Sequence, residues 1–176
     1  LARPKDVNLF IEVARVYGWN NQNRRSAELY QRVLQGAPNR RRDVERPLAF
    51  QLLWSGQGAR AIPYFRDALV RRPDDVKARL EYAQALAATG DSKPAVAQFR
   101  RVLAVEPKNW AARLGAARML VRERRYHDAL ADYQQLVKHR PGDSDLLIET
   151  ARVYGWDNRN ARSAALYERV IAVAPK

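Results

Sequence analysis

The sequence repeats itself with a period of 34 residues, and this period constrains the fold more than any other feature. The hexapeptide Ala-Arg-Val-Tyr-Gly-Trp occurs at Ala14–Trp19 and again at Ala151–Trp156. When residues 6–38 are aligned with residues 143–175, 21 of 33 positions are identical. The offset of 137 residues equals four periods plus one residue, so three further copies are expected between these two.

Three kinds of residue recur at fixed places in all five copies. A proline closes each copy, at Pro38, Pro73, Pro107, Pro141 and Pro175. Eight residues before each proline stands an aromatic residue: Tyr30, Phe65, Phe99, Tyr133 and Tyr167. Small residues stand twelve and twenty-four residues before it, namely Ser26, Ala61, Ala95, Ala129 and Ser163, and Ala14, Ala49, Ala83, Ala117 and Ala151. The apolar residues between them keep a helical spacing that is interrupted once per copy, which predicts two helices in each copy.

These positions resemble the tetratricopeptide repeat (TPR) family, whose 34-residue unit has small residues at positions 8 and 20, an aromatic at 24 and a proline at 32. The resemblance covers Pro4 to Lys176. It implies an all-α fold, a right-handed α-solenoid of five TPR helix-turn-helix units in a single array over residues 1–176. The repeats are expected at approximately residues 7–41, 42–75, 76–109, 110–143 and 144–176. Positions within a repeat are counted from the first residue of each range.

The first helix of each repeat is expected to end near position 15, where a left-handed backbone conformation would stop it. Four repeats carry a residue there that tolerates this conformation: Asn21, Gly56, Gly90 and Asn158. The fourth repeat departs from the pattern with Arg124. Its turn is therefore predicted to be either strained or differently shaped.

Two prolines and one extra residue interrupt the pattern of the second repeat. The extra residue is expected in the connecting loop at Asn39–Asp43. Pro47 is compatible with a helix that Asp43 caps, because the amides of a first helical turn have no internal partner. Pro63 is expected to remove one backbone hydrogen bond near the start of its helix and to bend that helix slightly.

Tryptophan occupies position 13, near the end of the first helix, in three repeats. Because a helix advances about 100° per residue, positions 2, 5, 6, 9 and 13 face broadly away from the apolar positions 4, 7, 8 and 11. The family resemblance implies that this outward face lines the concave groove of the superhelix, where ligands bind. Candidate groove-binding residues on it are Arg15, Trp19, Arg46, Trp54, Arg118, Arg122, Arg152 and Trp156. Such residues can stack on sugar rings or hold carboxylates, or the arginines can simply stack on the tryptophans.

Gly18 and Gly155 precede two of these tryptophans inside the helix, where glycine is about 1 kcal/mol less favourable than alanine. Two explanations are open at this point. The missing side chain could clear space beside the indole for a ligand. It could equally make room for a neighbouring helix.

The sequence has no motif for catalysis, a cofactor or a metal. It contains no cysteine, and its two histidines, His127 and His139, have no spaced partners. The recurring Glu12 and Glu149 are expected to pair with Arg15 and Arg152, each three residues further along the helix. We therefore expect no catalytic residues, no metal and no cofactor, and a chain that is not an enzyme. No apolar stretch approaches the roughly 20 residues that span a bilayer, so no membrane insertion is expected.

The chain starts without an initiator methionine or a signal peptide, and we interpret it as a piece of a longer repeat array. Its net charge of +13, from 32 Lys and Arg against 19 Asp and Glu, favours an anionic partner. The same excess could also be an ordinary solvated surface. The compartment is open, because a chain without cysteine suits the cytosol and the periplasm equally.

Tryptophan after Tyr-Gly at the end of a first helix resembles the periplasmic repeat arrays of bacterial exopolysaccharide exporters of the cellulose, poly-N-acetylglucosamine and Pel types. This resemblance implies a periplasmic scaffold that docks a partner protein or a polysaccharide in its groove. One alternative is a peptide-binding adaptor for an acidic partner segment. Another is non-specific nucleic-acid binding, but the repeats differ at their groove positions, which argues against specific base reading.

Overall fold

The computed structural model describes residues 6–173, which form ten α-helices and one short 3-10 helix, with no β-strand among them. In the first three repeats the helices are α1 (Val7–Trp19), α2 (Asn23–Gly36), the 3-10 helix η1 (Pro38–Arg40), α3 (Arg41–Trp54), α4 (Gly58–Arg71), α5 (Val76–Thr89) and α6 (Ser92–Val105). The remaining helices are α7 (Trp110–Arg122), α8 (Tyr126–His139), α9 (Ser144–Trp156) and α10 (Asn160–Val173). The predicted all-α class, with two helices per repeat, is confirmed.

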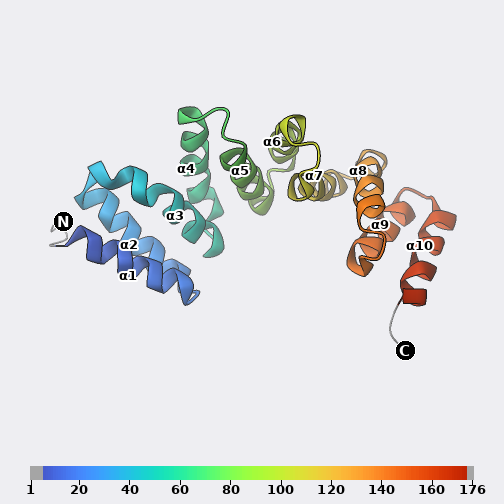
Figure 1. Ribbon diagram of the computed structural model, residues 1–176, viewed down its shortest axis with the longest axis horizontal. Helices are drawn as coiled ribbons and strands as arrows, with labels where there is room; N and C mark the ends of the chain where they lie inside the picture. Colours follow the sequence, from blue (N-terminus) through green and yellow to red (C-terminus); the bar gives the residue numbers. More distant parts are fainter. Residues whose placement is uncertain (1–5, 174–176) are drawn as a thin grey trace. The chain divides into compact units, whose positions relative to one another are not determined.

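The described chain divides after Gly90 into two compact units. In the first unit α1 to α5 follow one another, and each helix packs on the next (Figure 1). In the second unit α6 to α10 pack in the same consecutive way. The third repeat supplies α5 to one unit and α6 to the other. That all five repeats form one array stays a prediction, and the two units are described separately.

Small residues hold the paired helices close together. Ala14 and Ser26, at positions 8 and 20 of the first repeat, are fully buried. The Ser26 hydroxyl donates a hydrogen bond of 2.7 Å to the Ala14 carbonyl. In the fifth repeat the Ser163 hydroxyl donates a bond of 2.8 Å to the Ala151 carbonyl. A larger residue at either position would separate the helices and break this contact.

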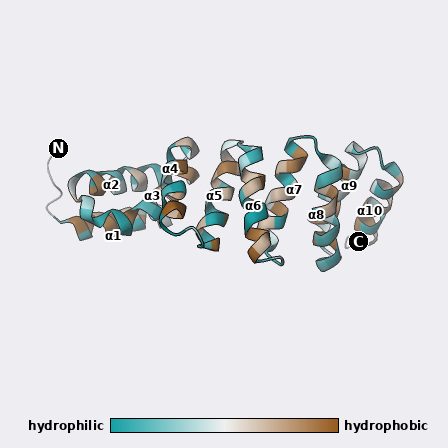
Figure 2. Ribbon diagram, turned by 90° about the horizontal axis from the view of Figure 1, so that it is seen from above, coloured by the Kyte–Doolittle hydropathy of each residue, from teal (hydrophilic) through white to brown (hydrophobic). Residues whose placement is uncertain are grey.

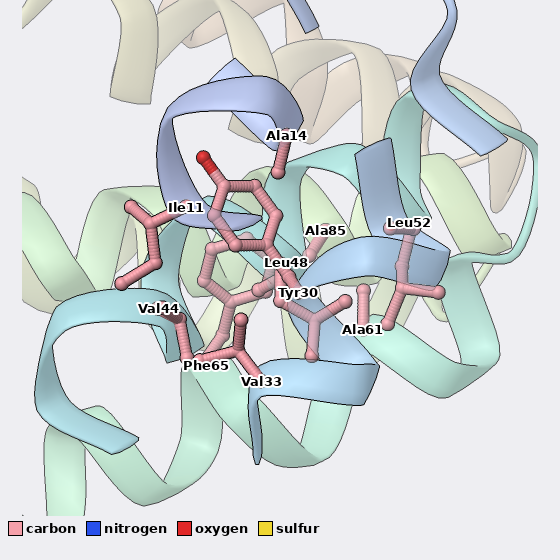
Figure 3. Packing of buried hydrophobic residues seen from close by; sticks show 12 residues of the cluster. Ile11, Ala14, Tyr30, Val33, Val44, Leu48, Leu52, Ala61, Phe65 and Ala85 are labelled. Atoms are coloured by element: carbon pink, nitrogen blue, oxygen red, sulfur yellow. The ribbon is translucent and has the colours of Figure 1, made fainter. Parts of the chain in front are cut away.

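The core of each unit lies between consecutive helices. In the first unit, Tyr30 of α2 and Phe65 of α4 pack among aliphatic residues of α1, α3 and α5 (Figure 3). In the second unit, Tyr133 of α8 lies in a cluster with residues of α7 and α9. The helices carry both hydrophilic and hydrophobic residues (Figure 2). Each repeat therefore buries its apolar face against its neighbours, as stacked repeats require.

The turns at position 15 all adopt the left-handed conformation. The φ angles are 57° at Asn21, 78° at Gly56, 91° at Gly90, 59° at Arg124 and 59° at Asn158. The prediction is thus confirmed at four positions. The fourth repeat has the same turn, with an arginine in a conformation that typically costs a residue with a Cβ atom about 1–2 kcal/mol.

The expected role of Asp43 as a helix cap is wrong. Helix α3 begins at Arg41, and no side chain caps it. Asp43 instead lies in the first turn and accepts a hydrogen bond of 2.5 Å from Nε of Arg40. The extra residue is taken up by η1 and the early start of α3 rather than by an open loop. Pro47 and Pro63 both lie inside their helices.

Candidate functional site

The three tryptophans at position 13 project into solvent. Their exposed fractions are 77% for Trp19, 61% for Trp54 and 52% for Trp156. Each is the last residue of its helix. None of the three rings lies under an arginine in the described part of the chain. The fourth tryptophan, Trp110, differs, because the guanidinium of Arg140 covers its ring at 3.9 Å.

In the first unit, three side chains stack along one side of α3. The guanidinium carbon of Arg46 lies 5.7 Å from the centre of the Phe50 ring. The Phe50 ring in turn stacks on Trp54, with 5.3 Å between the ring centres. The residues are four apart, which is the spacing that places helical side chains one above the other. Phe50 was not predicted as a site residue, although it occupies position 9, the same position as Arg15.

Arg46 also joins two repeats. Its guanidinium donates two hydrogen bonds to the carboxylate of Glu81 on α5, one of them 2.9 Å long from Nε. Glu81 is buried, and its charge is compensated by this bidentate pair. Arg46 and Glu81 lie in the wall of a hollow of about 530 Å³, which Tyr64, Arg42 and Lys77 also line.

Gly18 is explained by a neighbouring helix. A Cβ atom at this position would lie only 2.8 Å from Nε2 of Gln51, on α3 of the next repeat. Gly155 has the same place in the fifth repeat, but the nearest atom to its Cβ would be the Ser163 hydroxyl at 3.6 Å. The second explanation, room for a neighbouring helix, therefore holds for Gly18. At Gly155 the corresponding space is open.

In the second unit, Glu149 of α9 connects three helices. It accepts hydrogen bonds of 2.8 Å and 3.0 Å from the guanidinium of Arg118 on α7. It also accepts a bond of 2.5 Å from the hydroxyl of Tyr133 on α8. The expected pairing of Glu149 with Arg152 is therefore wrong, because Arg118 and Tyr133 occupy the carboxylate. The corresponding pair in the first repeat does form, with 2.6 Å between Oε1 of Glu12 and Nη1 of Arg15.

These contacts change the pKa values of Glu149, Tyr133 and Arg118. Burial alone would raise the pKa of Glu149, but the hydrogen bonds from Arg118 and Tyr133 and the nearby arginine charges lower it below its usual value. Burial and the bond to Glu149 raise the pKa of Tyr133. The bond to Glu149 raises the pKa of Arg118. At neutral pH the carboxylate is charged, and the Tyr133 hydroxyl is its donor.

A hollow of about 480 Å³ lies beside this network. It brings together three of the predicted residues, Arg118, Arg152 and Trp156, with Val121 and Ile148 as its apolar lining. The Trp156 ring rests against Tyr126, with 5.7 Å between the ring centres. Glu149 also lines the hollow, but Arg118 and Tyr133 already bind it.

The predicted arginines fall into two groups. Arg15, Arg46 and Arg118 each form an ion pair with a carboxylate. Arg122 and Arg152 are exposed and form no ion pair within the described residues. Of these two, only Arg152 lines the hollow in the second unit. The sequence pattern missed that Glu81 and Glu149, both at position 6, bind arginines of other repeats.

The described part of the chain shows no arrangement of side chains that could hold a metal ion. Among residues 6–173, no helix is long and apolar enough to cross a membrane. His127 lies on the surface, where its Nδ1 is 2.7 Å from a guanidinium nitrogen of Arg159. The exposed faces present aromatic rings and guanidinium groups.

Comparison with known proteins agrees with the repeat geometry. A family model described as tetratricopeptide repeat matches residues 52–112, and a second with the same description matches residues 89–144 and 114–176. No curated protein matches the sequence. Neither family model describes an enzyme.

Solved structures have the same fold. MamA 41-end from Desulfovibrio magneticus RS-1 aligns with a TM-score of 0.83 at 14% identity, over 98% of this chain and 97% of that chain. A tetratricopeptide repeat protein from Parabacteroides merdae ATCC 43184 aligns with a TM-score of 0.76 at 20% identity, over 99% and 68% of the two chains. At these identities the likeness concerns the fold alone. The chain belongs to the tetratricopeptide repeat family, whose fold is that of a non-catalytic protein-interaction scaffold.

Proposed function

We propose that the chain docks a partner protein or a polymer on the exposed faces of α1, α3, α7 and α9. The observation that carries this proposal is the exposure of Trp19, Trp54 and Trp156 at one repeat position. Single exposed apolar residues are common on protein surfaces, but three large rings at equivalent places form a recurrent feature. Exposed aromatic rings next to arginines have the composition of binding hot spots.

We further propose that this docking serves a bacterial exopolysaccharide synthesis or secretion complex, with the chain in the periplasm. The resemblance of the Tyr-Gly-Trp segments to exporter repeat arrays supports this finer assignment. The chemistry is suitable as well, because an indole ring can cover the apolar face of a sugar while a guanidinium binds its oxygens. Trp156 with Arg152 beside the second hollow offers both groups together.

A titration with cello-oligosaccharides and with N-acetylglucosamine oligomers, followed by calorimetry, tests the sugar assignment. The double variant Trp19→Ala/Trp156→Ala should weaken binding at least about tenfold, because stacking contributes on the order of 1 kcal/mol or more per ring. The matched control is Val70→Ala/Val105→Ala, which removes two exposed apolar side chains from α4 and α6. Equal affinities for the wild type and the tryptophan variant would remove the sugar assignment and leave protein docking in place.

A second candidate is an acidic segment of a partner protein. It is favoured by Arg122 and Arg152, which are exposed and form no ion pair within the described residues. A fluorescent poly-glutamate peptide should bind at low salt and lose affinity as salt rises. Arg122→Ala/Arg152→Ala should weaken this binding more than Arg15→Ala, because Arg15 is already paired with Glu12. Binding that is identical in both variants would reject this candidate.

A further inference from the structure

The hollow of the first unit contains cations that no contact within the unit uses. Residues of α3, α4 and α5 line this hollow of about 530 Å³, where the second repeat meets the third. Its charged lining consists of five cations, Arg42, Arg46, Arg71, Arg72 and Lys77, and three carboxylates, Glu45, Asp75 and Glu81. The charges that the chain itself does not compensate decide what the hollow can bind.

The two buried carboxylates of the hollow are compensated within the chain. Glu45 is only 4% exposed, and it accepts hydrogen bonds from Arg41 and, at 2.6 Å, from Nη2 of Arg71. Glu81 is held by the bidentate pair with Arg46. Because a buried carboxylate that loses its partner is costly, these arginines stay with the carboxylates and are not available to a ligand.

The remaining cations of the hollow are Arg42, Arg72 and Lys77. All three are exposed, and none forms an ion pair with the described residues. The remaining carboxylate, Asp75, caps α5 and accepts a hydrogen bond of 2.9 Å from the backbone amide of Ala78. Five positive charges against three negative ones leave the lining with a net charge of +2.

The three free cations are particular to this junction between repeats. They stand at position 1 and position 31 of the second repeat and at position 2 of the third. At the other junctions these positions hold Val7, Ala37 and Asp43, then Val76, Glu106 and Ala111, and then Trp110, Arg140 and Asp145. The single cation among these nine residues, Arg140, covers the Trp110 ring. The repeat fold therefore does not require three cations here.

The hollow also has apolar lining and room for an organic group. Ala49, Phe65 and Ala68 line it beside the charged residues. Tyr64 adds a hydroxyl that forms no hydrogen bond with the described residues. The volume lies within the range of about 300–1,000 Å³ that is usual for sites of small organic ligands. A matching ligand therefore combines two negative charges with an organic group.

We propose that this hollow binds a small organic phosphate monoester, whose phosphate is held by Arg42, Arg72 and Lys77. A phosphate monoester carries a charge of about −1.5 to −2 at pH 7 and has three strong acceptor oxygens. A carboxylate or a sulfate ester carries only one negative charge. Hydrogen bonds between guanidinium or ammonium groups and phosphate are charge-assisted and therefore strong. The inference goes beyond the proposed function and does not depend on the tryptophans.

Calorimetric titration with phenyl phosphate and phenyl sulfate at pH 8 and low salt tests the charge match. The two probes have similar shapes and differ by one charge, so phenyl phosphate should bind about tenfold more tightly. The second proton of a phosphate monoester has a pKa of about 6, and no histidine lines the hollow. The advantage of phenyl phosphate should therefore disappear at about pH 5. Equal affinities at pH 8, or no measurable binding of phenyl phosphate, would overturn the proposal.

Substitutions locate the bound phosphate. Arg42→Gln, Arg72→Gln and Lys77→Gln should each weaken the binding of phenyl phosphate about tenfold, because each removes a charge-assisted hydrogen bond. The control Arg101→Gln removes the same charge from an exposed arginine of α6 and should bind as the wild type does. An equal loss in the control would show attraction by the net charge alone and would overturn the proposal. A phosphotyrosine tripeptide that binds more tightly than phenyl phosphate would assign the hollow to a phosphorylated protein segment instead.

Discussion

Glu149 accepts hydrogen bonds from two other helices, so its ionisation is linked to the stability of the second unit. Its pKa is lowered in the folded chain, and its stabilising contribution is therefore present above the unfolded pKa of about 4.3. The contribution is lost as pH falls through the folded value. We expect Glu149→Gln to unfold more easily than the wild type at pH 7, with a difference that shrinks below about pH 4.

Chemical denaturation of both proteins between pH 3 and pH 7 measures this difference. Glu168→Gln is the matched control, because Glu168 is an exposed carboxylate on α10. It should change the free energy of unfolding little at any pH. A Glu149→Gln effect of constant size over the whole range would contradict the linkage.

Gly18 and Gly155 form a natural matched pair, because both stand between tyrosine and tryptophan. Alanine is about 1 kcal/mol more favourable than glycine inside a helix. We expect Gly155→Ala to raise the free energy of unfolding by up to about this amount, since its Cβ meets only the Ser163 hydroxyl at 3.6 Å. Gly18→Ala should raise the free energy of unfolding by less, because the amide of Gln51 must move away from the new Cβ atom. Denaturant titrations of the two variants compare these gains, and equal gains would show that the Gln51 contact has no effect on stability.

At the scale of helices, the contact between α6 and α7 depends on the absence of a side chain. A Cβ atom on Gly115 would overlap the Phe99 ring, which is buried. We expect Gly115→Ala to destabilise the second unit by about 1–3 kcal/mol, despite the higher helix propensity of alanine. Thermal or denaturant unfolding would measure the loss, and Gly155→Ala is its control. A stabilised Gly115→Ala variant would contradict this packing.

The α1–α3 contact contains one polar atom without a partner. Oε1 of Gln51 is buried and accepts no hydrogen bond, while the other repeats have an apolar residue at position 10. We expect Gln51→Met to raise the free energy of unfolding by about 1 kcal/mol, because the buried acceptor is removed and the volume is kept. Denaturant unfolding against the wild type is the measurement. A lower free energy of unfolding in the variant would mean that the amide nitrogen of Gln51 stabilises the fold by more than its unpaired Oε1 destabilises it.

The helices were predictable because each is specified locally by apolar spacing, small residues and turn residues that recur at fixed positions. The left-handed turns at Asn21, Gly56, Gly90 and Asn158 followed from the same pattern. The start of α3 was not predictable in this way. Its first turn contains no capping side chain, and Asp43 binds the side chain of Arg40 instead.

The exposed tryptophans were predictable from helical geometry, but their surroundings were not. Phe50 stacks on Trp54 because the residues are four apart on one helix, a local relation that the sequence does contain. The pairs Arg46–Glu81 and Arg118–Glu149 join different repeats. They depend on how far one helix is rotated and shifted against the next, which no spacing within a single repeat specifies.

At the scale of the whole molecule, the net charge of +13 attracts any polyanion. We expect random single-stranded oligonucleotides to bind at about 50 mM salt and to dissociate as salt approaches about 200 mM, because phosphate contacts release counterions. Fluorescence anisotropy over a salt series measures this. Binding that persists at high salt, or that depends strongly on base sequence, would instead indicate a nucleic-acid site.

The central claim is that the indole rings of position 13 are the contact points of a docking surface. The four indole NH resonances of a 1H–15N NMR spectrum test it directly, because Trp110 lies under Arg140 and is an internal reference. On titration with a sugar oligomer or an acidic peptide, we predict shifts for Trp19, Trp54 or Trp156 and none for Trp110. A bound ligand that shifts only Trp110, or that leaves all four resonances unchanged, would contradict the claim.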